Sequence, residues 1–197
     1  MTTSRIPQRS TLALTIALAL SGCGGGGGDS APAIPTSAPP PPPTGTVLNG
    51  VVTDGYVSGA TVYVDLNNNN TKDANEPSAL TDASGKHTLN ASLTAAQLNG
   101  QRLRVLGGTD NSTGQPFTHS MSGLVEDAAS KPFVPVSPLS SIVEGMVASG
   151  AASSPAQARE NVARVLGLSS GAALDKDPLT IAGTEKPLLQ KMVALQK

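Results

Sequence analysis

The central part of the chain alternates between apolar and polar positions over short stretches. Residues 47–52 (VLNGVV) and 60–65 (ATVYVD) are separated by TDGYVSG, a segment rich in turn-forming residues. Within 60–65, Thr, Tyr and Asp alternate with Ala, Val and Val. This period of two is typical of a strand with one buried face. The pattern therefore predicts two strands.

Further strands are predicted along the next forty residues. Residues 79–81 and 86–89 flank the turn sequence DASG, an arrangement that predicts a β-hairpin. Residues 102–106 (RLRVL) form another strand pattern, which ends at two glycines. Several short strands with turn signals about every ten residues are typical of a sandwich of antiparallel sheets.

The pattern changes to a helical period at Ser137. Ser137 and Pro138 suit the N-cap and first position of a helix, and an apolar face follows as far as Gly150. Residues 154–167 repeat this design, with a capping box at SPAQ and a glycine at the end. A third helix is predicted from Thr184 to the last residue. The fold class predicted is therefore mainly β: an antiparallel β-sandwich followed by a small segment of two to three helices.

The same patterns divide the chain into consecutive parts. Residues 47–108 are the predicted sandwich, 109–136 a polar linker and 137–197 the helical segment. Residues 23–46 contain five consecutive glycines and five consecutive prolines, and they lack the bulky apolar side chains that a core needs. Because proline runs favour extended polyproline II, we expect this segment to be a tether.

Residues 1–22 have the organisation of an export signal. Arg5 and Arg9 precede the apolar run TLALTIALAL, which at ten residues is far shorter than the roughly 20 that a membrane span needs. The sequence LSGC follows and ends at Cys23, the only cysteine of the chain. This combination resembles a bacterial lipoprotein signal, in which the cysteine is lipidated and becomes the mature N-terminus. The alternative is an ordinary signal peptide with an incidental cysteine.

The resemblance to a lipoprotein implies where the protein is and what it contacts. A lipid on Cys23 would attach it to a membrane surface in the cell envelope. Gly24, rather than Asp, follows the cysteine, which by the same resemblance implies sorting to the outer membrane in a Gram-negative host, the localisation we expect.

Charge and aromatic content exclude several kinds of partner. Loss of the two signal arginines leaves 11 basic against 14 acidic residues, a net charge of −3. This mild acidity, without a basic stripe, argues against nucleic-acid binding. Trp is absent, and only two Tyr and two Phe are present. Platforms of stacked aromatic side chains for sugars or single-stranded nucleic acid are therefore not expected.

Residues 65–76 (DLNNNNTKDANE) carry oxygen-bearing side chains at regular intervals. They match the register of the twelve-residue calcium loop of EF-hands. Its ligand positions 1, 3, 5, 7, 9 and 12 fall on Asp65, Asn67, Asn69, Thr71, Asp73 and Glu76. Ca²⁺ prefers six to eight oxygens, and here carboxylates, amides and the Thr71 carbonyl would supply them. Position 6 is Asn70 instead of Gly, and Asn tolerates a left-handed backbone. The pattern predicts a Ca²⁺ site; the alternative is an Asn-rich turn without metal.

The residues around this loop differ from those of an EF-hand, because a strand precedes it and Pro77 follows it. The sequence GATVYVDLNNN, followed by DANEP and TDASG, resembles calcium-binding β-sandwich modules of bacterial surface proteins. These include the B-type repeats of Gram-positive adhesins and the carboxypeptidase-regulatory-like domains. The resemblance covers about residues 47–106, and it implies an Ig-like or transthyretin-like sandwich with a structural Ca²⁺.

The helical part carries a second resemblance. The segments SPLSSIVEGMVASG, RVLGL and DPL resemble a helical region that follows calcium-loop sandwiches in other exported bacterial proteins, often in longer chains. Together with the uncapped third helix, this indicates a truncated member of a longer family.

No catalytic set is expected in this chain. His87 and His119 have no zinc-site spacing, no G-x-S-x-G sequence is present, and the cysteine is assigned to the anchor. We expect His87 to be solvated on a strand face. The acidic pairs Glu126-Asp127 and Asp175/Asp177 are expected to be solvated or to cap helices.

The function predicted is that of a membrane-anchored surface lipoprotein. Its calcium-braced sandwich would serve as a structural or adhesive module, with an extracellular or envelope protein as its partner. The alternative is an accessory or regulatory domain of an envelope enzyme whose catalytic part is absent here.

Overall fold

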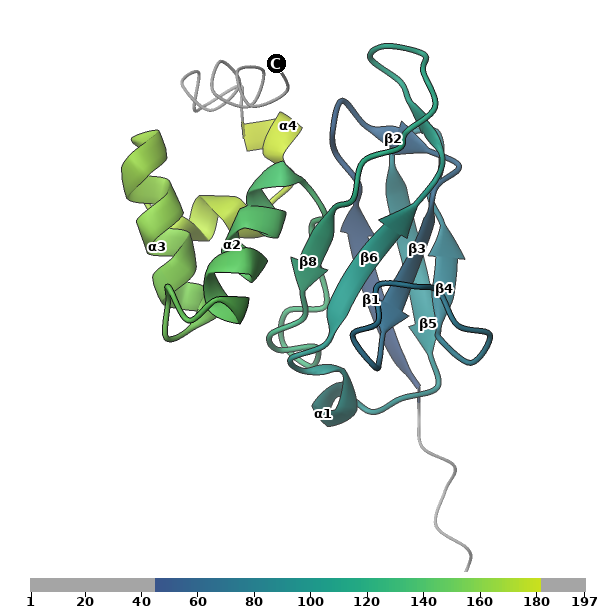
Figure 1. The fold of residues 1–197 in the computed structure, drawn as a ribbon, viewed down its shortest axis with the longest axis horizontal. Coiled ribbons are helices and arrows are strands. Elements are labelled where there is room, and N and C mark those ends of the chain that lie inside the picture. The colour runs from purple at the N-terminus through teal and green to yellow at the C-terminus, as the bar shows by residue number, and fades with distance from the viewer. Residues whose placement is uncertain (1–44, 182–197) are drawn as a thin grey trace, which may run out of the picture. The chain divides into compact units, whose positions relative to one another are not determined.

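The computed structural model describes residues 45–181, which form eight β-strands, four α-helices and one 3₁₀-helix (Figure 1). The predicted signal, Cys23, most of the tether and the predicted third helix lie outside these residues. The strands are β1 (Thr46–Val51), β2 (Val57–Ser58), β3 (Thr61–Asp65), β4 (Ser78–Leu80), β5 (Lys86–Ala91), β6 (Arg102–Leu106), β7 (Thr109–Asp110) and β8 (Ser122–Leu124). The helices are α1 (Ala95–Leu98), α2 (Pro138–Ala148), α3 (Pro155–Leu166), η1 (Gly171–Asp175) and α4 (Pro178–Ile181).

The strands pair in three antiparallel sheets. The largest has the order β4-β3-β6-β8, and the other two are the pairs β1-β5 and β2-β7. In the four-stranded sheet Val62 lies opposite Val105, and Asp65 opposite Arg102. The prediction of a β-rich fold with a few helices is therefore confirmed.

The hairpin predicted around DASG is wrong in its pairing but right in its turn. Asp82 accepts hydrogen bonds from the backbone of Ser84 and Lys86, at 2.7 and 2.9 Å, which forms the turn. However, β4 pairs with β3, whereas β5 pairs with β1. The buried Thr81 hydroxyl donates to the Val57 carbonyl at 2.7 Å and holds the chain there. The chain therefore passes from one sheet to another at this turn.

The segment 109–136, predicted as a linker, contributes to the sheets. It contains β7 and β8, and its last residues run parallel to β1. The Val134 amide donates to Asn49 at 2.8 Å and the Val136 amide donates to Val51 at 2.9 Å. The apolar residues in this polar-looking segment are too few to show a period, so its pairing was not visible from the sequence.

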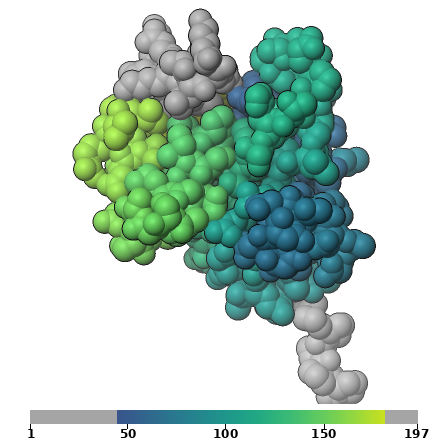
Figure 2. Space-filling model, in the orientation of Figure 1, coloured from purple at the N-terminus to yellow at the C-terminus, as the bar shows by residue number. Residues whose placement is uncertain are grey.

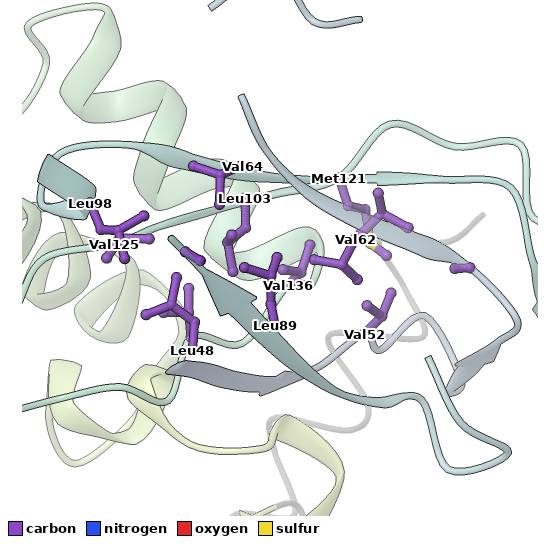
Figure 3. Close-up of a cluster of buried hydrophobic side chains, with 14 of the residues drawn as sticks. Leu48, Val52, Val62, Val64, Leu89, Leu98, Leu103, Met121, Val125 and Val136 are labelled. Atoms are coloured by element: carbon purple, nitrogen blue, oxygen red, sulfur yellow. The ribbon is translucent and has the colours of Figure 1, made fainter. Parts of the chain in front are cut away.

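One hydrophobic cluster joins the β1-β5 pair to the four-stranded sheet. Figure 3 shows its aliphatic side chains pointing toward one another from both sheets and from the segment 121–136. Its largest fully buried side chains are those of Leu48, Leu89, Leu98 and Leu103. As the sequence implies, this core is almost entirely aliphatic, with Phe117 as its one aromatic ring.

Both faces of β3 are buried, although its alternation predicted one exposed face. Val62 and Val64 face the cluster, and Tyr63 and Asp65 on the opposite face are also inaccessible. The strand lies between β4 and β6, and Arg104 of β6 extends its side chain to Asp65. The polar face of β3 is therefore covered in part by the Arg104 side chain of the adjacent strand β6.

The first two of the three predicted helices are present, with serine N-caps as expected. The Ser137 and Ser154 side chains accept hydrogen bonds at the N-termini of α2 and α3, and Gly167 ends α3 with φ of 69°. The capping box at SPAQ is only half formed, because the Gln157 side chain accepts from Ser153 instead of Ser154. A second apolar cluster lies between the helices.

The helices pack against the β8 edge of the sheet. Figure 1 shows α2 beside β8 with α3 beyond it, and in the space-filling view the green helical residues lie directly against the teal strand residues (Figure 2). Arg159 of α3 is nine-tenths buried and forms a two-pronged ion pair with Glu126, which follows β8. Its Nε also contacts Asp175 at 3.1 Å.

His87 is buried, so the prediction of a solvated histidine is wrong. It is only 4% exposed, and neither ring nitrogen has a hydrogen-bond partner in the described structure. It lies opposite Gly50 of β1, where an added Cβ would be 2.6 Å from the imidazole Cε1 and 2.2 Å from the Val134 carbonyl oxygen. Gly50 therefore provides the space that the imidazole occupies.

Burial of His87 makes stability depend on pH. Burial lowers the pKa of His87 from 6.5 to about 4. The unfolded chain therefore binds a proton between these values that the folded chain does not, so stability falls as the pH falls from 6.5 to 4. The loss amounts to about 3 kcal/mol. In urea unfolding at several pH values, His87→Leu should flatten this decline, whereas His119→Leu, at an exposed histidine, should not. An unchanged slope in His87→Leu would contradict the assignment.

Candidate metal centre

The predicted calcium loop, residues 65–76, connects β3 to β4. Because these strands are antiparallel partners, the loop begins and ends at one place. Two hydrogen bonds fasten its ends: the Val64 amide donates to Pro77 at 3.0 Å, and the Leu66 amide donates to Glu76 Oε1 at 2.8 Å. The loop is therefore held at its base by the sheet.

Asp65 is a fully buried carboxylate at the first position of the loop. Its Oδ1 accepts from the Asn69 amide at 3.1 Å, and its Oδ2 accepts from the Asn70 amide at 3.1 Å. Arg104 Nε also donates to Oδ2, again at 3.1 Å. An isolated buried charge would be costly, and these partners compensate it. Burial raises the pKa of the neighbouring Tyr63, and the negative charge of Asp65 raises it further.

Left-handed residues turn the loop back over Asp65. Asn68 and Asn70 have φ of 58° and 61°. Asn is among the residues that adopt this conformation at least cost. The conformation expected of Asn70, at the usual glycine position, is confirmed.

Glu76 closes the loop from its other end. Its carboxylate is 4% exposed, and each oxygen accepts one backbone hydrogen bond: Oε1 from Leu66, and Oε2 from Asp73 at 3.0 Å. Both carboxylate oxygens are thus turned toward the loop interior instead of solvent.

Three more of the predicted ligands meet at the outer part of the loop. The Nδ2 groups of Asn67 and Asn69 donate to Oδ2 of Asp73 at 2.7 and 3.0 Å. Their Oδ1 atoms accept from the amides of Asn69 and Thr71. The two amides thus occupy the side of Asp73 on which a cation would be attracted. For oxygen coordination, each amide would have to turn its Oδ1 toward Asp73.

The carboxylates do not form a metal cluster by themselves. Within the described residues, no three side chains among His, Cys, Asp and Glu lie close enough together to hold a metal ion. Thr71 is exposed and hydrogen-bonded through its amide. Any coordination here therefore depends on the amide and backbone oxygens as well as the carboxylates.

Two arginines of β6, which were not among the predicted site residues, belong to this region. Arg104 bonds to Asp65, and Arg102 bonds to Asn68 of the loop. Arg102 also pairs with Glu144 of α2, whose other oxygen accepts from Ser122 at 3.2 Å. The alternation in RLRVL was a signal, because it places both arginines on the sheet face that carries Asp65. A chain of contacts thus joins the loop to α2.

The other acidic candidates are structural. Glu126 and Asp175 form ion pairs with Arg159, so the expectation that they are solvated or cap helices is wrong for them. Asp177 accepts from the Leu179 amide at 3.0 Å in the first turn of α4, which is the capping role expected, and from the Tyr56 hydroxyl at 3.1 Å. His119 contacts the ring of Phe117.

The helices of residues 45–181 include none with the length and apolarity required to cross a bilayer. Comparison with protein-family models, with curated proteins and with solved structures finds no match to this chain.

Proposed function

We propose that this chain is a lipid-anchored surface protein of the bacterial envelope, whose β-rich unit is braced by Ca²⁺ in the loop 65–76 and serves as a structural or adhesive module. The observation that carries the proposal is that five predicted ligands are held by hydrogen bonds within one short loop. Asp65 and Glu76 are buried at its base, and Asn67, Asn69 and Asp73 converge above them.

The fold proposed is an Ig-like or transthyretin-like antiparallel sandwich. The β1-β5 pair and the four-stranded sheet share one buried aliphatic cluster, which is what the facing sheets of a sandwich require. The loop connects two strands of the larger sheet, so a bound ion would lie at the end of the sandwich.

The chemistry of the loop favours a hard divalent cation. Carboxylates, amide oxygens and backbone carbonyls are the ligands that Ca²⁺ takes, and it accepts irregular geometry. Asp65, Asp73 and Glu76 bring three like charges into twelve residues, and a cation between them would relieve their repulsion. Rotation of the two amides would exchange their hydrogen bonds to Asp73 for two oxygen ligands.

Calcium would act on more than the loop. Asp65 is linked to β6 through Arg104, and Asn68 is linked to α2 through Arg102 and Glu144. An ion that fixes the loop would therefore fix the contacts among β3, β6 and α2.

Calcium should raise the melting temperature of the full-length protein. An ion bound only by the folded state stabilises it by RT ln(1 + [L]/Kd), about 2.7 kcal/mol at a hundredfold excess over Kd. For a unit of this size the shift is about 10 °C. Extracellular modules have Kd on the order of 10⁻⁴–10⁻³ M, so binding requires millimolar calcium and the hundredfold excess corresponds to about 10–100 mM. Calorimetry with calcium and with chelator measures the shift.

Glu76→Gln should abolish most of that shift, because it removes a buried carboxylate with two oxygens directed into the loop. Asn75→Ala is the matched control: Asn75 is an exposed loop residue at a position that supplies no ligand. It should retain the shift. A melting temperature insensitive to both calcium and chelator would leave the loop as an Asn-rich turn.

The anchor rests on the sequence LSGC behind an apolar run of ten residues. Lipidation of Cys23 would place the folded unit on a membrane surface, with residues 23–46 as the spacer. The proposed partners are accordingly the membrane, through the lipid, and an extracellular or envelope protein.

Cys23→Ala should release the protein from the membrane fraction of cells, since the acylated residue is lost. Detergent phase partitioning before and after the substitution measures this, with Ser21→Ala, which leaves the cysteine and a small residue before it, as the control. If Cys23→Ala still partitions with detergent, the anchor is not at this residue.

We assign no catalysis to this chain. His87 lies in the interior without a polar partner, and His119 contacts an aromatic ring, so neither is paired with a nucleophile in the described structure. Hydrolysis of ester or peptide substrates by the pure protein should not exceed the buffer rate. Hydrolysis that disappears in His87→Ala or His119→Ala would overturn this assignment.

A further inference from the structure

A cavity of about 400 Å³ lies between the segment that follows β8 and the helical elements. Its lining residues come from the range 124–135 and from α2, α3, η1 and Lys176. This volume falls within the range of small-molecule sites, which are mostly apolar with a few polar groups. The cavity is separate from the loop 65–76, with which it shares no residue.

The walls of the cavity are largely apolar, and one of them is held in place by β1. Phe133 is bridged to Asn49 of β1, and its neighbour Val134 belongs to the buried cluster. Phe133 itself remains 40% exposed and lines the cavity, as do the buried Val143 and Leu174. An exposed phenylalanine on a fixed backbone provides contact area for an apolar ligand at little entropic cost.

The charges at the cavity leave an unpaired cation at its rim. Arg159 is occupied by Glu126 and Asp175, so its guanidinium is not free for a ligand. The Nζ of Lys131 also forms an ion pair with Asp175, at 3.9 Å from its Oδ2. Lys176 is exposed, and within residues 45–181 its ammonium takes part in no ion pair.

We propose that this cavity binds a single-chain amphiphile with one anionic head, a medium-chain fatty carboxylate. The acyl chain would lie against Phe133 and the apolar wall, and the carboxylate would pair with Lys176. Lys176 offers one positive charge that is unpaired in the part of the chain that the structure describes, so a monoanionic head group matches it better than a polyanion such as a phosphate ester. Among its described lining residues the cavity has one aromatic side chain, and the only arginine there is already paired with two carboxylates. The cavity is therefore poorly suited to sugars or nucleobases.

Binding is tested by NMR on the full-length chain with Cys23→Ala, which carries no acyl group. Dodecanoate, below its micellar concentration, should shift the backbone amides of residues 124–134 and 172–176. 1-Dodecanol should bind about two- to fivefold more weakly, as should dodecanoate to Lys176→Ala, because one exposed ion pair contributes about that factor. Inorganic phosphate should cause no shifts there. Lys86→Ala, at an exposed lysine on β5, is the matched control and should bind as the parent does.

A cavity-filling substitution tests the location without disturbing either core. Ala172 is exposed and lines the cavity, so Ala172→Trp should abolish the shifts while the rest of the spectrum stays the same. Ala151→Trp, at an exposed alanine outside the cavity, should bind normally.

Three results would overturn the proposal. One is that the Ala172→Trp variant binds dodecanoate as tightly as the parent does, which would place the ligand elsewhere. Another is equal binding of dodecanol and dodecanoate, which would remove the anionic specificity. The third is binding that appears only when residues 182–197 are deleted, which would assign the cavity to the chain's own C-terminal segment. None of these measurements depends on calcium, so the proposal stands or fails independently of the loop.

Discussion

The structure around the candidate site depends on one buried charge, the carboxylate of Asp65. A carboxylate with no access to water is tolerated only where donors surround it. Here the donors are two loop amides and the Arg104 guanidinium, so satisfying this one group sets both the loop conformation and the contact with β6. Removal of Arg104 would leave the charge partly uncompensated. The same requirement explains why two left-handed asparagines follow Asp65, since only a reversing backbone brings amides 69 and 70 back to it.

Two kinds of connection unite the sheets and the helices of residues 45–181. The first is backbone pairing: residues 132–136 run along β1 and lead directly into the N-cap of α2. The second is a pair of ionic contacts between elements distant in sequence, namely Arg102 with Glu144 and Arg159 with Glu126. Both arginines are substantially buried, so removing the carboxylate partner of either would reduce the stability of the fold by more than the loss of a surface ion pair does. The helical segment is thus held to the β-rich part by directed polar contacts as well as by apolar packing.

The loop and the cavity use opposite physical chemistry within this framework. The loop gathers oxygen atoms and negative charge at the end of a sheet, which suits a hard cation. The cavity combines apolar walls with a rim lysine whose charge is unpaired in the described structure, which suits a monoanionic amphiphile. Both lie next to α2: Glu144 connects it to the loop, and Val143, on the adjacent position, lines the cavity. Helix α2 therefore contributes one residue to each region.

The sequence alone determined the local elements and the spacing of oxygen-bearing side chains in the loop 65–76, because these depend on near neighbours. The strands 47–52, 60–65 and 102–106, the serine caps of α2 and α3, and the left-handed Asn70 all follow from periods and propensities that act over a few residues. The pairing of β5 with β1 instead of β4 was decided by the tertiary structure, because a turn specifies a reversal but not the partner. Burial of His87 was decided the same way, since the space for its ring exists only where Gly50 of another strand lies opposite. The roles of Arg102, Arg104 and Arg159, and the strand-like path of residues 132–136, also required the fold, because each depends on a partner at least 33 residues away in the chain.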